Sequence, residues 1–236
     1  MKILVVAAHP DDEVLGCGGT LFKLSKNRAN KIFIAFAADG VLGRYDKIEP
    51  NDLSDDALLE IEDRKKSARE AGRLLDAEIL NISDQNFTFE FLDQRLDHYP
   101  IKKIIDWASG HISQVKPEII YTHFSGDINK DHRLVAEAVL VATRPSKYDF
   151  LKKIYSFEIN MADTNQGRNL QIPGFNPNVF EKIEIARKIK LFSRYQSEHK
   201  YWKSYQKDIE TIAKYRGLGS SYDFAEAFML IRERHD

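Results

Sequence analysis

Four polar residues that can do chemistry follow the first apolar run of the chain, in ILVVAAHPDDE. His9 ends the run, and Asp11, Asp12 and Glu13 come directly after Pro10. Three adjacent carboxylates repel one another unless a cation or water screens them. An imidazole and a carboxylate on a rigid turn are ligands that Zn²⁺ accepts, and a catalytic zinc keeps a further position open for water. The pattern therefore indicates a metal site at His9 and Asp12.

Two other interpretations of this segment stay open at this point. Carboxylates at a helix N-terminus are stabilised by the helix dipole, which accounts for the acidic residues but not for His9. The glycines of LGCGGT suggest a dinucleotide-binding turn. They lack the G-x-G-x-x-G spacing, however, and carboxylates stand where a pyrophosphate would need neutral or positive surroundings.

A second polar cluster follows a later apolar run, in THFSGDINKDH. Its polar residues are His123, Asp127, Asn129, Asp131 and His132. Ligands of an open α/β sheet bind beyond the carboxyl ends of its strands, where both clusters are expected to lie. We expect His132 to complete a His-Asp-His set with His9 and Asp12. The adjacent Asp131 can orient a neighbouring imidazole or carboxylate.

The elements that must position these clusters alternate along the chain. Short apolar runs predict strands at 3–8, 31–38, 78–82, 118–124 and 152–159. Amphipathic patterns predict helices at 14–26, 54–77, 101–115, 131–143, 181–192 and 199–215, with an irregular segment at 162–178 and a late strand or helix at 227–233. This alternation is typical of a Rossmann-like α/β fold, a mostly parallel sheet with helices on both faces. We expect one domain over residues 1–236.

The composition argues against several classes of partner. Of the 236 residues, 43% are hydrophobic and 30% charged, which is an ordinary globular composition. Lys and Arg number 35 against 36 Asp and Glu, so no net charge favours nucleic acid or an anionic membrane. The N-terminal apolar run ends at Ala8, unlike a signal peptide, and no run approaches the ~20 residues of a membrane span. With one cysteine as well, we expect a cytoplasmic protein.

The two clusters together resemble a known enzyme family. AHPDDE after a strand, with a D-H pair after a later strand, is similar to the zinc-dependent N-acetylglucosamine deacetylases called LmbE-like or PIG-L-like. Further similar pieces are LGCGGT, Arg64 and Glu70, SRYQSEH (193–199) and YDFAEAF (222–228). The resemblance implies a hydrolase that removes the acetyl group from an N-acetylated amino sugar or its conjugate. It also implies one Zn²⁺ per chain and a small-molecule sugar partner.

The resemblance assigns roles to particular residues. His9, Asp12 and His132 match the metal ligands, and Asp11 matches the general base. Zinc would lower the pKa of its water toward ~7 and polarise the carbonyl, while Asp11 takes the water's proton and passes it to the leaving amine. Arg44, in ADGVLGRYD, lies where such enzymes contact a sugar. Weaker candidates for contact with the sugar at this edge of the sheet are Glu158, Tyr195 and Glu226.

The sequence departs from the family at Asn129, where many members carry a histidine that assists proton transfer or polarises the carbonyl. Asn129 can donate a hydrogen bond to an oxyanion but cannot act as an acid. Asp131 stays a catalytic candidate beside it, and Asp127 a candidate to contact the sugar. His123 is either a second proton donor near the substrate or a core histidine of a buried strand. These alternatives stay open on the sequence.

Two other function classes are compatible with the residues. A metal-dependent phosphoesterase also uses Asp and His ligands, often around two metals, whereas one full ligand set can be assembled here. A carbohydrate-binding module without turnover would not need the base Asp11. Metal content and acetate release separate the three classes.

Overall fold

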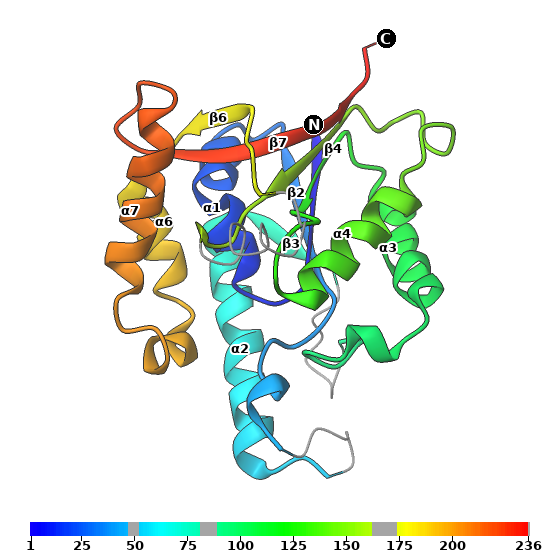
Figure 1. Cartoon of the computed structure of the whole chain (residues 1–236), viewed down its shortest axis with the longest axis vertical. Helices are drawn as coiled ribbons and strands as arrows, with labels where there is room; N and C mark the ends of the chain where they lie inside the picture. The colour runs from blue at the N-terminus through cyan, green and yellow to red at the C-terminus, as the bar shows by residue number, and fades with distance from the viewer. Residues whose placement is uncertain (47–51, 81–88, 162–173, 236) are drawn as a thin grey trace.

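The apolar run of the N-terminus forms the central strand of a seven-stranded sheet in the computed structural model, ordered β3-β2-β1-β4-β5-β7-β6 (Figure 1). The structure describes residues 1–46, 52–80, 89–161 and 174–235. The strands are β1 (Lys2–Ala7), β2 (Lys31–Phe36), β3 (Ala77–Ile79), β4 (Ile119–His123), β5 (Lys153–Phe157), β6 (Val179–Lys182) and β7 (Ala225–Glu233).

Most neighbouring strands run in the same direction. Strand β1 pairs in parallel with β2 and with β4, so that Ile3 lies opposite both Ile32 and Ile119. The pairs β2–β3 and β4–β5 are also parallel, whereas β7 is antiparallel to both β5 and β6. The prediction of a mostly parallel sheet is therefore confirmed, and the late apolar segment is a strand.

Helices cover both faces of the sheet, as the alternation predicts (Figure 1). They are α1 (Asp12–Ser25), α2 (Asp55–Leu74), α3 (Ile101–Val115), α4 (Lys130–Ala142), α6 (Ile185–Phe192) and α7 (Tyr205–Leu218), with 3-10 turns at Leu42–Arg44, Leu96–His98 and Gln196–Lys200. Helices α3 and α4 pack on one face, and α1, α2, α6 and α7 contribute to the core on the other.

The central strand contributes to both cores. Ile3 and Val5 belong to the hydrophobic cluster under α1 and α2, whereas Leu4 and Val6 belong to the cluster under α3 and α4. All four side chains are fully buried. A parallel strand covered on both faces must be apolar at every position, which explains why the run is continuous rather than alternating.

Several predicted elements have different limits in the structure, three of them near the site or the last strands. Helix α1 begins at Asp12 rather than at residue 14. The helix expected at 181–192 begins at Ile185, because Val179–Lys182 pairs as strand β6 with β7. The helix expected at 199–215 is divided into a 3-10 turn at Gln196–Lys200 and α7. Part of the segment 78–82 and most of 162–178 lie outside the described residues.

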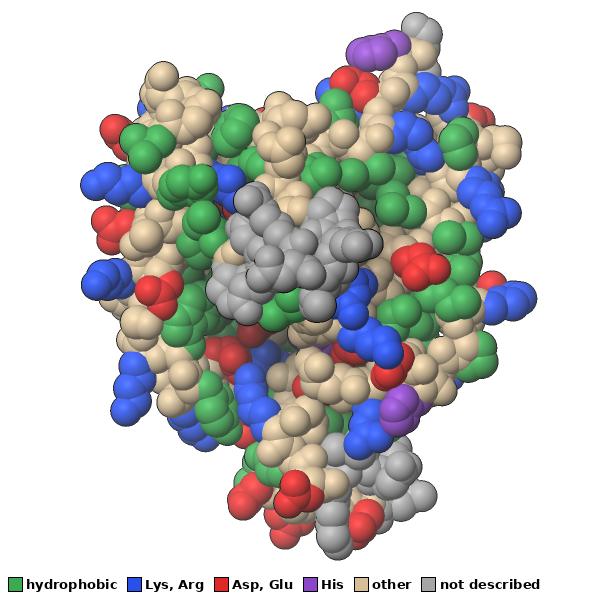
Figure 2. All heavy atoms as spheres, in the orientation of Figure 1, with side chains coloured by type: hydrophobic (Ala, Val, Ile, Leu, Met, Phe, Trp, Pro, Cys, Tyr) green, Lys and Arg blue, Asp and Glu red, His purple; other side chains and the backbone are tan. Residues whose placement is uncertain are grey.

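Charged side chains of both signs are interspersed on the face drawn in Figure 2. Within the part of the chain that the structure describes, none of the helices combines the length and the apolar character that crossing a membrane requires.

Candidate metal centre and active site

The turn between β1 and α1 places three predicted site residues at the carboxyl edge of the sheet. Asp11 precedes α1 with a backbone φ of 125°, a region that residues other than glycine rarely adopt. The N–H groups of Val14 and Leu15 hold this conformation by donating to the Asp11 carbonyl oxygen at 3.0 and 2.9 Å. Such backbone strain persists only where the surroundings fix it, and it often accompanies function.

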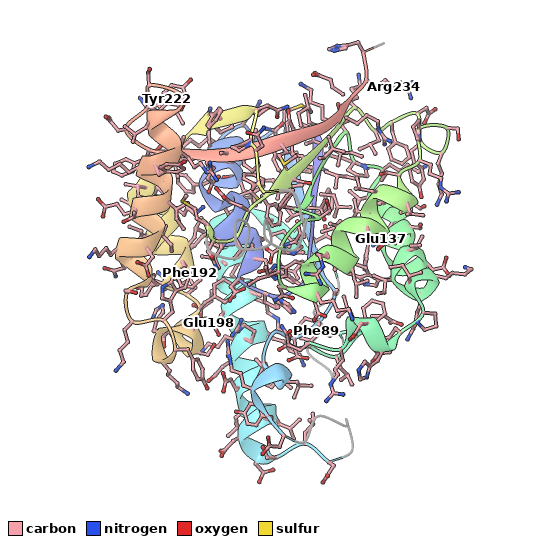
Figure 3. All side chains as sticks on the ribbon, viewed as in Figure 1. Phe89, Glu137, Phe192, Glu198, Tyr222 and Arg234 are labelled. Atoms are coloured by element: carbon pink, nitrogen blue, oxygen red, sulfur yellow. The ribbon has the colours of Figure 1, made fainter. Side chains whose placement is uncertain are left out.

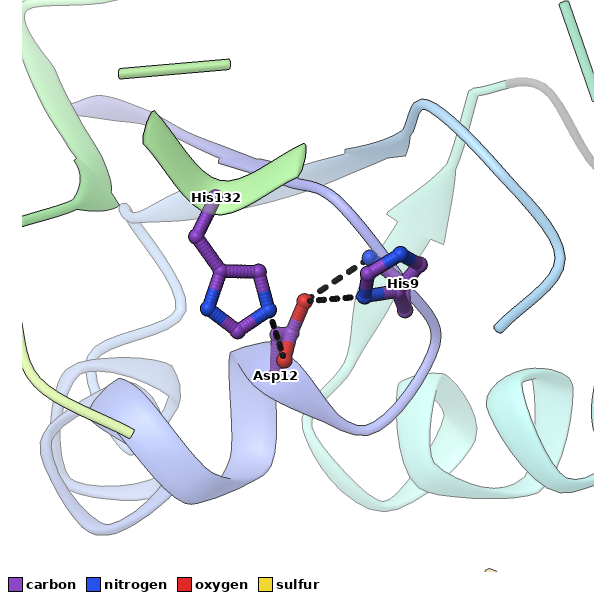
Figure 4. A group of neighbouring side chains, drawn as sticks. All are labelled: His9, Asp12 and His132. Carbon is purple, nitrogen blue, oxygen red and sulfur yellow. Dashed lines mark hydrogen bonds and ion pairs between the residues drawn. The ribbon is translucent and has the colours of Figure 1, made fainter. Parts of the chain in front are cut away.

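The structure brings the three predicted metal ligands together (Figure 4). Asp12 lies between the two imidazoles: its Oδ2 is 3.5 Å from His9 Nδ1, and its Oδ1 is 3.5 Å from His132 Nε2. One donor atom from each residue lies within 4.8 Å of the others. All three side chains are buried. Two imidazole nitrogens and one carboxylate oxygen form a donor set that fits a divalent ion such as Zn²⁺.

The predicted ligand His132 is contacted by two other predicted site residues. Asp127 Oδ2 lies 3.0 Å from His132 Nδ1, which leaves the Nε2 of His132 directed toward Asp12. The ring of His123 stacks on that of His132, with centroids 4.1 Å apart and planes at 11°. Asp127 and His123 are almost fully buried, and neither lines the cavity described below. The structure therefore places both against the predicted ligand His132 and outside the lining of the cavity.

His123 has the environment of a neutral core histidine. Its Nε2 accepts a hydrogen bond of 2.8 Å from the Ala8 N–H. Burial, with a smaller contribution from His132, lowers the pKa of His123 to about 4. Although Asp12 Oδ2 lies 3.3 Å from the same nitrogen, an Nε2 that accepts a hydrogen bond from the Ala8 N–H carries no proton to donate to Asp12.

The other predicted histidine ligand, His9, faces two more carboxylates. Its Nε2 lies 3.0 Å from Asp93 Oδ1 and 3.2 Å from Asp131 Oδ2. Burial alone would lower the pKa of His9, but Asp93, Asp12 and Asp131 raise it well above its usual value. Carboxylates that bind the outer nitrogen of a metal-ligating histidine fix its orientation and tautomer. His9, Asp93 and Asp131 also lie close enough together to form a second group of potential ligands.

The expected base, Asp11, is held by an arginine. Arg64 Nη1 donates to Asp11 Oδ2 at 3.0 Å and to the Pro10 carbonyl at 2.8 Å, and its Nη2 bonds to Glu198. Burial raises the pKa of Asp11 well above its usual value, while Arg64 acts in the opposite direction. Asp11 lies beside the ligand set without belonging to it.

Glu13 also stabilises the turn between β1 and α1. The Tyr195 hydroxyl donates to Glu13 Oε1 at 2.5 Å, and the Asp11 N–H donates to Oε2 at 3.0 Å. Burial raises the pKa of Glu13 to about 7. Tyr195 is fully buried, so its role here is to hold this turn rather than to line the rim.

An open cavity of about 410 Å³ reaches the ligand set. His9, Asp11, Asp12 and His132 line one end, and Leu15, Ile159 and Trp202 supply apolar side chains to the wall. Gly40 is also part of the wall, with φ of +70°, and a Cβ added there would lie 2.9 Å from His9 Cβ. The cavity therefore joins the candidate ion and base to a space that a small molecule can enter.

Two further predicted residues, Asn129 and Arg44, line this cavity. Asn129 caps helix α4, where its Oδ1 accepts a 3.0 Å hydrogen bond from the Asp131 N–H, which leaves its side-chain N–H groups for other contacts. Arg44 donates from Nη2 to both carboxylate oxygens of Glu198, at 2.7 and 2.9 Å, and from Nη1 to Glu60 at 3.1 Å.

Comparison with protein families identifies the family to which this chain belongs. Residues 4–143 match the family model described as "PIG-L: GlcNAc-PI de-N-acetylase". The chain belongs to the PIG-L family. The resemblance inferred from AHPDDE and the D-H pair is thereby confirmed, and the family is by its description one of N-deacetylases.

Individual members and neighbours extend the PIG-L similarity over the whole chain. A diacetylchitobiose deacetylase from Thermococcus kodakarensis is 26% identical over 252 residues, which cover 98% of this chain and 83% of the relative. The N,N'-diacetylchitobiose deacetylase of Pyrococcus horikoshii, solved with its inhibitor MPG, superposes with a TM-score of 0.74 at 20% identity, covering 98% of this chain and 83% of that one.

The same fold also occurs with another reaction. GalB, a 4-carboxy-2-hydroxymuconate hydratase from Pseudomonas putida, superposes with a TM-score of 0.71 at 17% identity, covering 100% of this chain and 98% of that one. Likeness at this level of identity shows the fold alone, so the reaction within the PIG-L family has to be argued from the site.

Three residues around the candidate site receive no role from the sequence. Asp93 lies in FLDQR, a segment without a metal-ligand pattern, and Glu198 and Arg64 were only supporting similarities. No local signal identifies Asp93, because it reaches His9 from a loop distant in sequence. Of the weaker candidates, neither Glu158 nor Glu226 lines the cavity.

Proposed function

We propose that this protein is a metal-dependent N-deacetylase that hydrolyses the acetamide of an N-acetylated amino sugar or its conjugate. The observation that carries the proposal is the position of Asp11, a buried carboxylate that lines the cavity beside the ligand set without belonging to it. A site that only binds a metal or a sugar would not require a carboxylate in this position to accept a proton. Membership of the PIG-L family and the relatives named as deacetylases support the same reaction.

His9, Asp12 and His132 would hold one divalent ion per chain, for which zinc suits the donor set. When bound, such an ion supplies a Lewis acid for the acetyl carbonyl and makes water a competent nucleophile near neutral pH. Asp131 and Asp127 hold the two imidazoles in the required orientation, through His9 Nε2 and His132 Nδ1.

Asp11 performs the proton transfers of the reaction. It accepts a proton from the attacking water and returns it to the amine nitrogen as the C–N bond breaks. Arg64 keeps the carboxylate in place through its 3.0 Å hydrogen bond to Oδ2. The side-chain N–H of Asn129 donates to the oxygen that becomes negatively charged, in place of the histidine found in many family members.

The remaining predicted residues hold or frame the reacting groups. Arg44 lies at the cavity wall, where it contacts the sugar or its appended group. His123 packs under His132 and takes no part in proton transfer. A cytoplasmic location and a small-molecule sugar partner are part of the proposal.

The test is a screen of N-acetylated sugars on zinc-loaded protein, in which released acetate and free amine are both quantified. We expect the two products in equal amounts, their loss on chelation, and their restoration by added zinc. A matched assay with phosphate monoesters and with unsaturated dicarboxylates tests the phosphoesterase and hydratase reactions. Zinc binding without acetate from any N-acetyl sugar would contradict the proposal and favour a binding module.

A further inference from the structure

The two arginines of the cavity wall are already bonded to carboxylates. Arg44 directs Nη2 at both oxygens of Glu198, at 2.7 and 2.9 Å, and Nη1 at Glu60, at 3.1 Å. One face of its guanidinium stacks on Tyr201, 4.3 Å from the ring centroid. Both terminal nitrogens and one face of the guanidinium are thus engaged before any substrate enters.

Arg64 is engaged in the same way and lies deeper. Its Nη1 donates to Asp11 Oδ2 and to the Pro10 carbonyl, and its Nη2 bonds to Glu198. The side chain is only 1% exposed. Glu198 therefore bridges the two arginines, and Figure 3 shows it beside α2, from which Arg64 projects.

The surroundings of the cavity carry an excess of negative charge. Asp11, Asp12 and Asp93 line it, and Asp131, Glu60 and Glu198 bond directly to side chains that line it. Apart from histidines, the cationic side chains among the described lining residues are Arg44 and Arg64. These six carboxylates, with Asp127 on His132 and Asp208 on Trp202 in addition, stand against two guanidinium groups and, when it is bound, one divalent ion. Negative charge stays in excess even with the ion counted.

We infer that this cavity selects uncharged N-acetylated sugars and disfavours the same sugars when they carry a phosphate, with Glu60 and Glu198 as the residues that set this preference. The inference rests on the proposed function and specifies its substrate class. A phosphate group would enter a region of like charge, and at Arg44 it would compete with two carboxylates that already hold the guanidinium. A neutral sugar is not repelled by the carboxylates and does not compete with them for Arg44.

The inference predicts a measurable preference between matched substrates. We expect kcat/KM for N-acetylglucosamine to exceed that for its 6-phosphate by roughly tenfold or more at low ionic strength. The difference should narrow at high salt, because salt screens repulsion between charges that are not fully buried. A 6-O-alkyl ether of similar bulk is the steric control and should behave like the uncharged sugar.

A charge-removing substitution tests the residue assignment. Glu60→Gln removes one carboxylate from Arg44 without touching Arg64 or Asp11, so the ratio of phosphorylated to uncharged kcat/KM should rise several-fold. Glu184→Gln is the matched control, because Glu184 bonds to Lys26 at an exposed position away from the cavity. The control should leave the ratio unchanged. A ratio that responds neither to Glu60→Gln nor to salt would overturn the inference.

Binding measurements separate this inference from the proposed function. If no sugar releases acetate, the proposed function fails, and ligand-observed NMR with the same two sugars still reports the charge preference. Stronger or equal binding of the 6-phosphate at low salt would overturn the inference while leaving deacetylation intact. If neither sugar binds and no N-acetylated sugar of the screen releases acetate, the inference and the proposed function are both overturned.

Discussion

Two buried ionic clusters lie around helix α1, and they differ in charge balance. In the first, which we call the inner pairs, Lys188 Nζ lies 2.7 Å from Glu226 Oε1, and Arg216 bonds to both oxygens of Glu158 at 2.5 and 2.6 Å. Each carboxylate of the inner pairs has its own cation. The hollow that they line measures about 20 Å³, close to the space of a single water.

The second cluster, which we call the rim cluster, has no such balance. It consists of His9, Asp11, Asp12, Asp93, Asp131 and His132. Four carboxylates meet two imidazoles and the single guanidinium of Arg64, beside a cavity of about 410 Å³. Buried charges need compensation, and here the protein supplies too little of it. Both clusters therefore contain buried charge, but a deficit of cations distinguishes the cluster that contains the predicted metal ligands.

The largest expected effect comes from the base of the rim cluster. Asp11→Asn preserves size but cannot accept a proton, so kcat should fall ~10²–10⁴-fold. KM should change little, since the group acts mainly in the transition state. Steady-state kinetics with parallel elemental analysis checks this, and zinc content should stay at the wild-type level. A kcat close to that of wild type would remove Asp11 from the mechanism.

Breaking an inner pair should affect stability rather than metal binding. Lys188→Met leaves Glu226 buried without its cation, a loss of about 3–5 kcal/mol in the free energy of unfolding. Glu226 keeps the N–H groups of Gly19 and Thr20 as donors. Urea denaturation measures the loss, and Lys188→Met combined with Glu226→Gln should recover part of it. Zinc affinity altered by the single substitution would contradict the separation of the two clusters.

Asp39, whose carboxylate accepts backbone hydrogen bonds, should make the free energy of unfolding depend on pH. Burial, reinforced by Asp93, raises the pKa of Asp39 from 3.8 to about 6. The folded state therefore holds this proton more tightly than the unfolded state, and the stability it contributes is complete below pH 3.8 and lost as pH rises through 6. When the pKa of a group differs by one between the folded and unfolded states, the free energy of unfolding changes by about 1.4 kcal/mol.

Asp39→Asn isolates this dependence. The asparagine Oδ1 can still accept from the Val41 and Leu42 N–H groups, which lie 2.7 and 2.8 Å from Asp39 Oδ1. The stability of the variant relative to wild type should therefore increase between pH 4 and pH 7, as measured by urea denaturation at each pH. Parallel pH profiles for the two proteins would show that Asp39 does not titrate in this range.

The smallest expected effect is that of His123. In His123→Gln the amide oxygen can replace Nε2 as acceptor of the Ala8 N–H, so kcat should fall less than about tenfold, with zinc retained. Asn129→Ala should lower kcat more, without removing a limb of the pH–rate profile. A collapsed kcat for His123→Gln, with a lost limb and intact zinc, would instead make His123 the proton donor.

The proximity of His9, Asp12 and His132 could be predicted from sequence because their positions are set locally. His9 and Asp12 follow the end of β1, His132 follows β4, and adjacent parallel strands bring their carboxyl ends to one edge. Asp93 and Glu198 could not be predicted in the same way. Both reach the site from irregular segments or short turns, whose paths depend on how the helices pack rather than on a local pattern.

Local sequence patterns were also insufficient to predict the structure at the edge of the sheet. The apolar periodicity of the segment near residue 185 predicts the helix correctly but extends it back into Val179–Lys182. Those four residues pair with β7, a strand more than 40 positions later, so their conformation depends on a partner that local periodicity does not report. Glu226, on that same strand, contacts Lys188 rather than the cavity for the same reason.

The central claim is that the rim cluster holds a metal ion through His9, Asp12 and His132. The most direct measurement is equilibrium binding of zinc to wild type, His132→Ala and the control His98→Ala, whose histidine is exposed in the turn Leu96–His98. Wild type and control should bind one zinc per chain with equal affinity, and His132→Ala should bind it at least ~100-fold more weakly while staying folded. Equal affinity in all three proteins would contradict the claim.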